Sequence, residues 1–175
     1  MMSGKTKKGL RAAAFLVVLG LLVFAAAMTA CGWDFTRLNT VTYTTNTHEI
    51  DAAFTDLSVQ TDTADVTFVP AADGRCRVVC QEPTGRPHTV TVQDGMLTVT
   101  AQDIWQWNNF IGIDWHQPTV AVYLPQTVYG VLSTRTSTGD ITLPQDFRFD
   151  SIQLTVSTGD ISCRASAADT VRLEA

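Results

Sequence analysis

Beyond residue 56 the apolar residues alternate with polar ones at a period of two. Val and Thr dominate these runs, and turn residues interrupt them about every 8 to 12 positions, which is typical of the short strands of an all-β fold. No helical period follows residue 35. The alternating apolar positions are Leu57, Val59, Val66, Phe68, Cys76, Val78, Cys80, Val90, Val92, Leu97, Val99, Val120, Val122 and Leu124.

Two short turns are expected between these strands. Residues 90–99 (VTVQDGMLTV) are two alternating runs joined by Asp94-Gly95. That dipeptide supplies the two positive φ angles of a type I′ turn, so the segment predicts a hairpin. A second turn is expected at Asp73-Gly74.

An apolar run precedes the β region. No charged residue lies between Arg11 and Asp34, and residues 12–33 are long enough as a helix to cross a hydrocarbon core of roughly 30 Å. The basic residues of segment 1–11 place that tail in the cytoplasm by the positive-inside rule, and therefore place the rest of the chain outside. Residues 34–50 are interpreted as a tether leading into a first strand, and residues 51–175 as one extracytoplasmic β domain.

The same run admits a second interpretation. Residues 27–31 (AMTAC) resemble a bacterial lipobox, in which Cys31 becomes lipidated after cleavage. Against this interpretation, Met28 stands where Leu is usual, and the apolar run is longer than the roughly 7 to 15 residues of a signal peptide. A single-pass anchor is therefore favoured, with a lipoprotein as the alternative.

The strongest feature of the β region is an internal repeat. Residues 132–141 (LSTRTSTGDI) align with residues 152–161 (IQLTVSTGDI) at an offset of 20, and residues 57–66 (LSVQTDTADV) match the same template at an offset of 75. A fixed period near 20, with a strand and a Gly-Asp turn in each unit, predicts coils that stack into a right-handed β-solenoid, or β-helix-like domain, with hairpins; a β-sandwich is the alternative.

The Gly-Asp pairs are interpreted as structural turns. Gly139 and Gly159 permit backbone angles that disfavour a Cβ, and Asp140 and Asp160 accept hydrogen bonds from backbone N–H groups. A calcium column is the alternative, although two or three Asp residues provide few oxygens for a cation that takes six to eight. Residues 171–175 align with residues 152–156 just before the next turn would begin, so the repeat is expected to end on an open coil that permits edge-to-edge association.

Charge and cysteine usage exclude several classes of partner and site. Four of the 12 basic residues lie in segment 1–11, which leaves eight Arg against 17 acidic residues and a net charge of −9 beyond it. So acidic a domain argues against nucleic acid as a partner. Cys76, Cys80 and Cys163 are an odd number, and His48, His88 and His116 are isolated in the sequence, so no disulfide framework, metal site or cofactor is expected.

A tryptophan-rich segment is the best candidate for ligand recognition. Residues 104–115 (IWQWNNFIGIDW) contain Trp105, Trp107 and Trp115. These rings form either a cap on one end of the fold or a platform for a cell-surface glycan or an envelope protein. The sequence leaves both alternatives open.

Several motifs together resemble a known family. They are Trp33-Asp34-Phe35, residues 61–66 (TDTADV), residues 122–125 (VYLP), and residues 137–141 (STGDI) with their copy at Ser157. The chain thereby resembles a bacterial membrane-anchored β-strand-repeat family of unknown function, whose members are described as candidate adhesins. The resemblance implies an uncleaved anchor, a right-handed β-helix-like domain and an adhesive or envelope-associated role, and it brings no catalytic residue with it.

Three classes of function follow from these features. A non-catalytic surface adhesion or envelope-interaction module is favoured. An accessory or sensor protein of envelope-stress signalling is the alternative, and a polysaccharide-active enzyme is less favoured. No G-x-S-x-G, H-E-x-x-H or glycine-rich phosphate loop is present.

Overall fold

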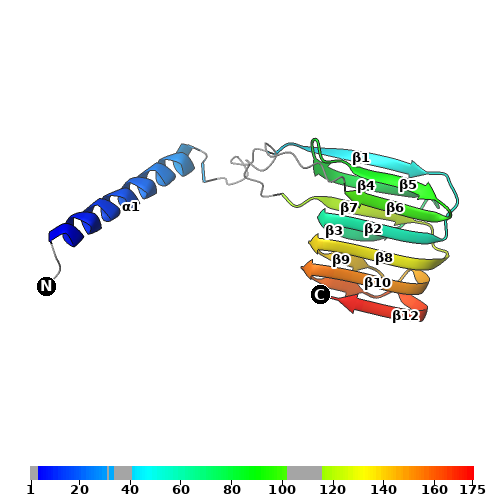
Figure 1. The fold of residues 1–175 in the computed structure, drawn as a ribbon. Helices are drawn as coiled ribbons and strands as arrows, with labels where there is room; N and C mark the ends of the chain where they lie inside the picture. Colours follow the sequence, from blue (N-terminus) through cyan, green and yellow to red (C-terminus); the bar gives the residue numbers. More distant parts are fainter. Residues whose placement is uncertain (1–3, 31, 34–40, 102–115) are drawn as a thin grey trace. The chain divides into compact units, whose positions relative to one another are not determined.

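The N-terminal part of the chain is one apolar helix. The computed structural model describes residues 4–30, 32–33, 41–101 and 116–175 (Figure 1). Helix α1 spans Gly4–Ala30, so it begins within the basic segment and ends at the last residue before Cys31. Its window Ala13–Ala30 has a mean hydropathy of 2.5, and it is long and apolar enough to cross a membrane.

The remainder of the described chain is β structure in two six-stranded sheets. The first sheet has the order β1-β4-β7-β3-β9-β11, and the second has the order β12-β10-β8-β2-β6-β5. Both sheets are mixed, because β1, β4 and β5 pair antiparallel with their neighbours while the repeat strands pair parallel. The strands are β1 (Tyr43–Ile50), β2 (Asp56–Thr63), β3 (Asp65–Pro70), β4 (Cys76–Pro83), β5 (His88–Gln93), β6 (Met96–Ala101), β7 (Thr119–Leu124), β8 (Val128–Thr138), β9 (Ile141–Leu143), β10 (Arg148–Thr158), β11 (Ile161–Cys163) and β12 (Ser166–Glu174).

The predicted repeat corresponds to stacked strand pairs. In each unit a strand of the second sheet passes through a tight turn into a strand of the first sheet, as in β2–β3, β8–β9 and β10–β11. Ile152 lies opposite Leu132, and Leu57 lies opposite Leu132 on the other side of β8. Residues separated by 20 or 75 positions in the sequence are therefore paired side by side in the sheet. Figure 1 shows the strands concerned, β2, β8 and β10, next to one another. Strands β8 and β10 each begin before the repeated motif, at Val128 and Arg148.

One hydrophobic core lies between the two sheets. The alternation predicts its inward positions correctly, because Val59, Val66, Val78 and Val120 are fully buried. Aromatic rings fill the end of the core near the repeats, where Phe147 and Phe149 are also buried. Burial of this apolar face against the opposite sheet is the main stabilising term of the β unit.

Both predicted turns are confirmed. Strands β5 and β6 form an antiparallel hairpin in which Gln93 lies opposite Met96, and Asp94 and Gly95 have φ angles of 51° and 77°. At the second turn Gly74 has a φ of 68°, and its N–H donates to the carbonyl of Ala71. This second turn leads into β4.

Candidate functional site

The repeated glycines lie where the backbones of neighbouring repeat units come into close contact. Gly139 and Gly159 have φ angles of 130° and 140°. A Cβ on Gly139 would collide with the carbonyl group of Ala64 in the coil beside it, and a Cβ on Gly159 would collide with that of Gly139. Glycine is required here by the contact as well as by the backbone angle.

The repeated aspartates form a hydrogen-bonded column along these turns. The N–H of Asp160 donates to Oδ1 of Asp140 at 2.8 Å, and the N–H of Asp140 donates to Oδ1 of Asp65 at 2.8 Å. Gln117 closes the column by donating to Asp65. The carboxylates thus bind backbone groups of the next coil, and within the described residues none of them belongs to a cluster of three candidate metal ligands.

Other predicted site residues lie outside the described residues. These are Cys31, the candidate lipidation site, and the tryptophans of the candidate platform, Trp105, Trp107 and Trp115. The three cysteines of the β unit are free: Cys76 and Cys80 are buried, and Cys163 is half-buried.

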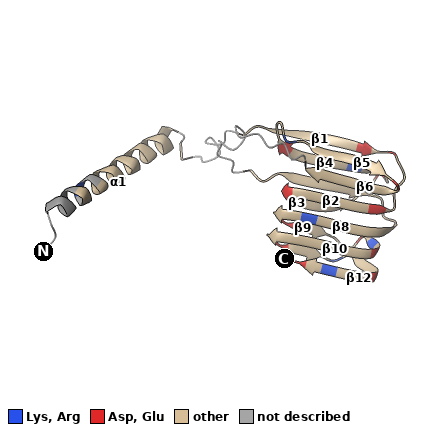
Figure 2. Ribbon diagram, viewed as in Figure 1, with Lys and Arg blue, Asp and Glu red and all other residues tan. Residues whose placement is uncertain are grey.

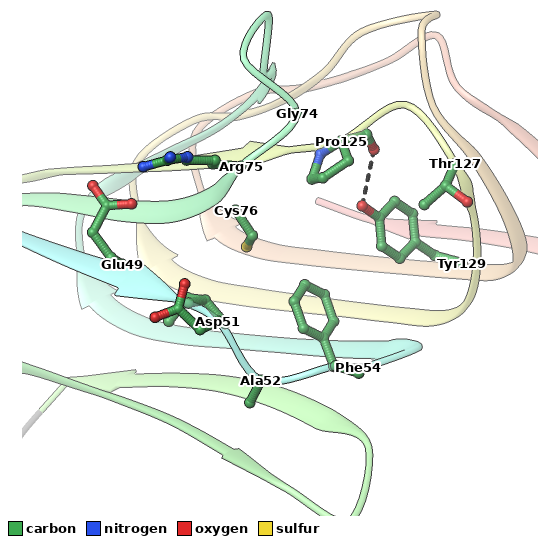
Figure 3. Close-up of a pocket in the computed structure, with 12 residues that line it drawn as sticks. Glu49, Asp51, Ala52, Phe54, Gly74, Arg75, Cys76, Pro125, Thr127 and Tyr129 are labelled. Atoms are coloured by element: carbon green, nitrogen blue, oxygen red, sulfur yellow. Dashed lines mark hydrogen bonds between the residues drawn. The ribbon is translucent and has the colours of Figure 1, made fainter.

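A pocket that the sequence did not indicate lies at the end of the β unit where three connections meet. Its volume is about 650 Å³, within the range of small-molecule sites. One wall is the segment after β1, another is the turn before β4, and the third is the connection from β7 to β8 (Figure 3). The lining residues are Glu49, Ile50, Asp51, Ala52, Ala53, Phe54, Gly74, Arg75, Cys76, Pro125, Thr127 and Tyr129.

Charged groups and aromatic rings occupy opposite sides of this pocket. Arg75, Glu49 and Asp51 are exposed, and the side chain of Arg75 forms no ion pair with any described residue. Across from them, Phe54 stacks on Tyr129 with ring centroids 6.0 Å apart (Figure 3). Tyr129 is held in place because its hydroxyl donates to the carbonyl of Pro125 at 2.9 Å. A ligand here would meet a guanidinium, two carboxylates and the face of Phe54.

The pocket's thiol and phenol are poorly suited to nucleophilic chemistry. Burial, and secondarily the carboxylate of Glu49, raises the pKa of Cys76 to about 11. Burial likewise raises the pKa of Tyr129 to about 12. Both groups are protonated at neutral pH, and no His lines the pocket as a general base. The thiol and the phenol of the lining are therefore not poised as nucleophiles at neutral pH.

Charged side chains are sparse elsewhere on the strands. Figure 2 shows long uncharged stretches of strand, with Asp and Glu mostly near strand ends. Arg77 is one of the few basic side chains on a strand, and it pairs with Asp73 at 2.9 Å while its guanidinium lies 4.2 Å from the centre of the Tyr123 ring. The acidic residues therefore lie mostly at strand ends and turns, and they do not form one continuous face on the described strands.

His88 is isolated in the sequence, but the fold places it beside Glu82. Its ring Nδ1 lies 2.5 Å from Oε2 of Glu82, and Cys80 joins these two residues in a buried cluster. The three residues come from β4 and from the first position of β5, which the short connection between those strands brings together. Their spacing, C-x-E-x₅-H, matches no standard metal motif, so a search for paired Cys or His spacings does not find it.

Several solved structures are similar to this chain at low sequence identity. One is a candidate adhesin from Bacteroides fragilis, with 11% identity, 76% of this chain and 93% of that chain covered, and a TM-score of 0.37. A second is a candidate cell adhesion protein from Clostridium sporogenes, with 6% identity, coverage of 77% and 99%, and a TM-score of 0.39. A third is a candidate lipid-binding protein from Parabacteroides distasonis, with 9% identity, coverage of 75% and 96%, and a TM-score of 0.31.

The sequence itself gives the firmer assignment. No curated protein matches the chain. The sequence profile described as Toastrack DUF4097 matches residues 54–175, which span the β unit from the pocket residue Phe54 through the repeats to β12. The chain therefore belongs to the Toastrack DUF4097 family.

Proposed function

We propose that this chain is a membrane-anchored, non-catalytic module of the bacterial cell surface that binds a saccharide of the envelope or of a neighbouring cell. The observation that carries the proposal is the pocket, which is lined on one side by Arg75, Glu49 and Asp51 and on the other by the ring of Phe54, with Arg75 in no ion pair to a described residue. Sugars present hydroxyl groups and an apolar C–H face, and this combination of groups complements both.

Membrane anchoring is proposed from the helix and its flanking charge. Helix α1 is apolar over Ala13–Ala30, and its basic residues all precede that window. The positive-inside rule then orients the β unit to the outside. Protease treatment of intact spheroplasts should degrade the β unit and spare the basic tail. A wild-type chain that keeps residues 1–30 by intact mass would support the helical anchor, whereas a chain that begins at a lipid-modified Cys31 would support the lipoprotein.

The β unit is proposed to be a right-handed solenoid. Support comes from the parallel, in-register stacking of β2, β8 and β10, whose offsets equal the sequence repeat. Parallel crossovers of this kind are right-handed in nearly all proteins. The strands between β4 and β7 interrupt the coils with antiparallel pairs, as the hairpin prediction anticipates.

Saccharide binding can be tested with the detergent-solubilised full chain on an array of purified bacterial and host surface glycans, followed by calorimetry on any hit. Arg75→Ala should weaken binding at least tenfold by removing the free guanidinium, and Phe54→Ala should weaken it by removing the stacking face. Arg135→Ala is the matched control, because Arg135 is exposed on β8 outside the pocket. Equal binding by all three variants would exclude this pocket as the saccharide-binding site. Turnover of a bound glycan would exclude a non-catalytic role.

The tryptophan-rich segment is proposed as a second contact surface. Replacing Trp105 and Trp107 with Ala distinguishes the two alternatives for it. Loss of glycan or cell binding with a retained circular dichroism spectrum supports the platform, whereas unfolding supports a cap on the fold.

A further inference from the structure

Three buried side chains with metal-binding atoms converge at the junction of β4 and β5. Cys80 and Glu82 lie on the inward side of β4, and His88 begins β5 in the opposite sheet. All three residues are buried, and one candidate ligand atom from each lies within 4.8 Å of the other two. The cluster is separate from the pocket of the proposed function, whose lining contains none of the three.

The carboxylate of this cluster is held in a fixed orientation. Oε2 of Glu82 accepts the backbone N–H of His88 at 2.7 Å and lies 2.5 Å from Nδ1 of the same residue. Oε1 accepts a hydrogen bond from Nδ2 of Asn46 at 2.6 Å. The bonds from Asn46 and from the backbone N–H of His88 are of the kind that orients a ligand carboxylate from outside the coordination sphere.

Two other atoms of the cluster lack partners. Nε2 of His88 is buried without a hydrogen bond, and the side chain is only 6% exposed. Sγ of Cys80 forms no hydrogen bond with any described residue, and Cys80 is fully buried. Burying an unpartnered imidazole nitrogen is unfavourable, and such groups in native proteins call for an explanation.

We propose that Cys80, Glu82 and His88 bind one zinc ion. Thiolate, imidazole and carboxylate are the three side-chain ligands that zinc takes in proteins, whereas sulfur and nitrogen exclude a calcium or magnesium site. Zinc binding releases the proton of the Cys80 thiol, since the ligand is the thiolate. Three protein ligands leave the fourth tetrahedral position for water.

The site would link the two sheets. β4 belongs to the first sheet and β5 to the second, and the connection between them is four residues long. A metal bound to ligands from both strands adds a crosslink at this end of the core, so zinc should raise the melting temperature of the folded chain.

The test uses the full chain with Cys31→Ser, stripped with a chelator under reducing conditions and then dialysed against zinc. We expect one zinc ion per chain when the zinc content of the dialysed protein is measured by elemental mass spectrometry. Cobalt(II) in place of zinc should give a thiolate-to-cobalt charge-transfer band in the near ultraviolet. Cys80→Ala should lose the bound metal and the band while keeping the Glu82–His88 contact, which does not involve the thiol.

Cys76→Ala is the matched control, because Cys76 is a second buried thiol on the same side of β4 and lies outside the cluster. Equal metal content in wild type and Cys80→Ala, or equal loss in Cys76→Ala, would overturn the proposal. X-ray absorption at the zinc edge of the wild-type chain provides a measurement that needs no variant: one sulfur per zinc agrees with the proposal, and none or two contradict it.

Discussion

The glycines of the repeat test how closely the coils pack. Gly139→Ala should reduce the free energy of unfolding by roughly 3 kcal/mol or more, because the new Cβ meets both an unfavourable φ and the carbonyl carbon of Ala64, 2.6 Å away. Urea denaturation followed by circular dichroism measures the change. The clash with Ala64 and the unfavourable backbone angle both contribute to this loss, so a control is needed that has only the second.

Gly74 provides that control. Its φ of 68° is also positive, but a Cβ there would meet no atom within 4 Å. Gly74→Ala should therefore cost only the roughly 1 to 2 kcal/mol of a left-handed backbone angle. If the two substitutions destabilise the chain equally, close contact between the coils is not what selects glycine at position 139.

Cys76 makes the stability of the fold depend on pH in the alkaline range. Its pKa rises from 9.0 to about 11 on folding, chiefly by burial. Between these values the folded state binds more protons than the unfolded state. The contribution of the Cys76 thiol to the free energy of unfolding is therefore complete below pH 9 and is lost as pH rises through 11. For one such group the free energy of unfolding falls by at most about 1.4 kcal/mol per pH unit.

The measurement compares urea midpoints at pH 8 and pH 10.5. The wild-type chain should lose more stability over this interval than Cys76→Ala, which lacks the titrating thiol. Cys80, whose pKa burial raises to about 12, titrates in both proteins and cancels in the comparison. Tyr129 does not cancel fully, because Cys76 contributes to its raised pKa, so the difference reports Cys76 together with that coupling. Parallel losses in the two proteins would show that burial does not perturb this thiol.

Among the elements, the turns of neighbouring coils are joined by the aspartate column. Asp140→Ala removes the acceptor of the Asp160 N–H and should cost roughly 0.5 to 1.5 kcal/mol, since the bond is exposed to water. Asp140→Asn keeps an oxygen in place and should recover most of that loss. Thermal denaturation of the three proteins provides the comparison.

Asp160→Ala is the reference for this effect. Its carboxylate accepts no hydrogen bond from any described residue, so the change should stay within about 0.5 kcal/mol. If Asp160→Ala is as destabilising as Asp140→Ala, the column owes its effect to local turn conformation rather than to bonds between coils.

The strands and turns were largely predictable because their signals are local or repeated. Asp94-Gly95 is sufficient for a hairpin, and the S-T-G-D motif marks positions that become neighbours in register, with Leu57, Leu132 and Ile152 side by side. Parallel stacking of identical units turns a sequence offset directly into a pairing. No three-dimensional knowledge is needed for that step.

The pocket and the buried cluster could not be predicted in this way. The pocket residues Asp51, Arg75 and Thr127 come from three connections that share no pattern. Cys80, Glu82 and His88 meet because β4 and β5 lie in different sheets. Sites of this kind depend on how non-repeating segments pack against the core, and sequence periodicity carries no information about that packing.

At the scale of the whole molecule, the repeat should allow one coil to be removed. Deleting residues 140–159 joins Gly139 to Asp160, so that β11 follows β8 and occupies the place of β9 beside β3. Strand β12 now pairs with β10 and would pair with β8 after the deletion. Its register would be unchanged, because Leu132 of β8 is equivalent to Ile152 of β10. Each unit of a repeat protein contacts only its neighbours, which is why the remaining interfaces survive.

The shortened chain should therefore fold cooperatively, with a lower free energy of unfolding because the core loses buried residues such as Leu154 and Phe149. Deleting residues 140–149 is the control, since ten residues are half of one period and the deletion would join the turn to Asp150, near the start of β10. That variant should lose its β spectrum by circular dichroism. A half-period deletion as stable as the full-period one would show that the 20-residue offset reflects sequence duplication without a requirement for register between the coils.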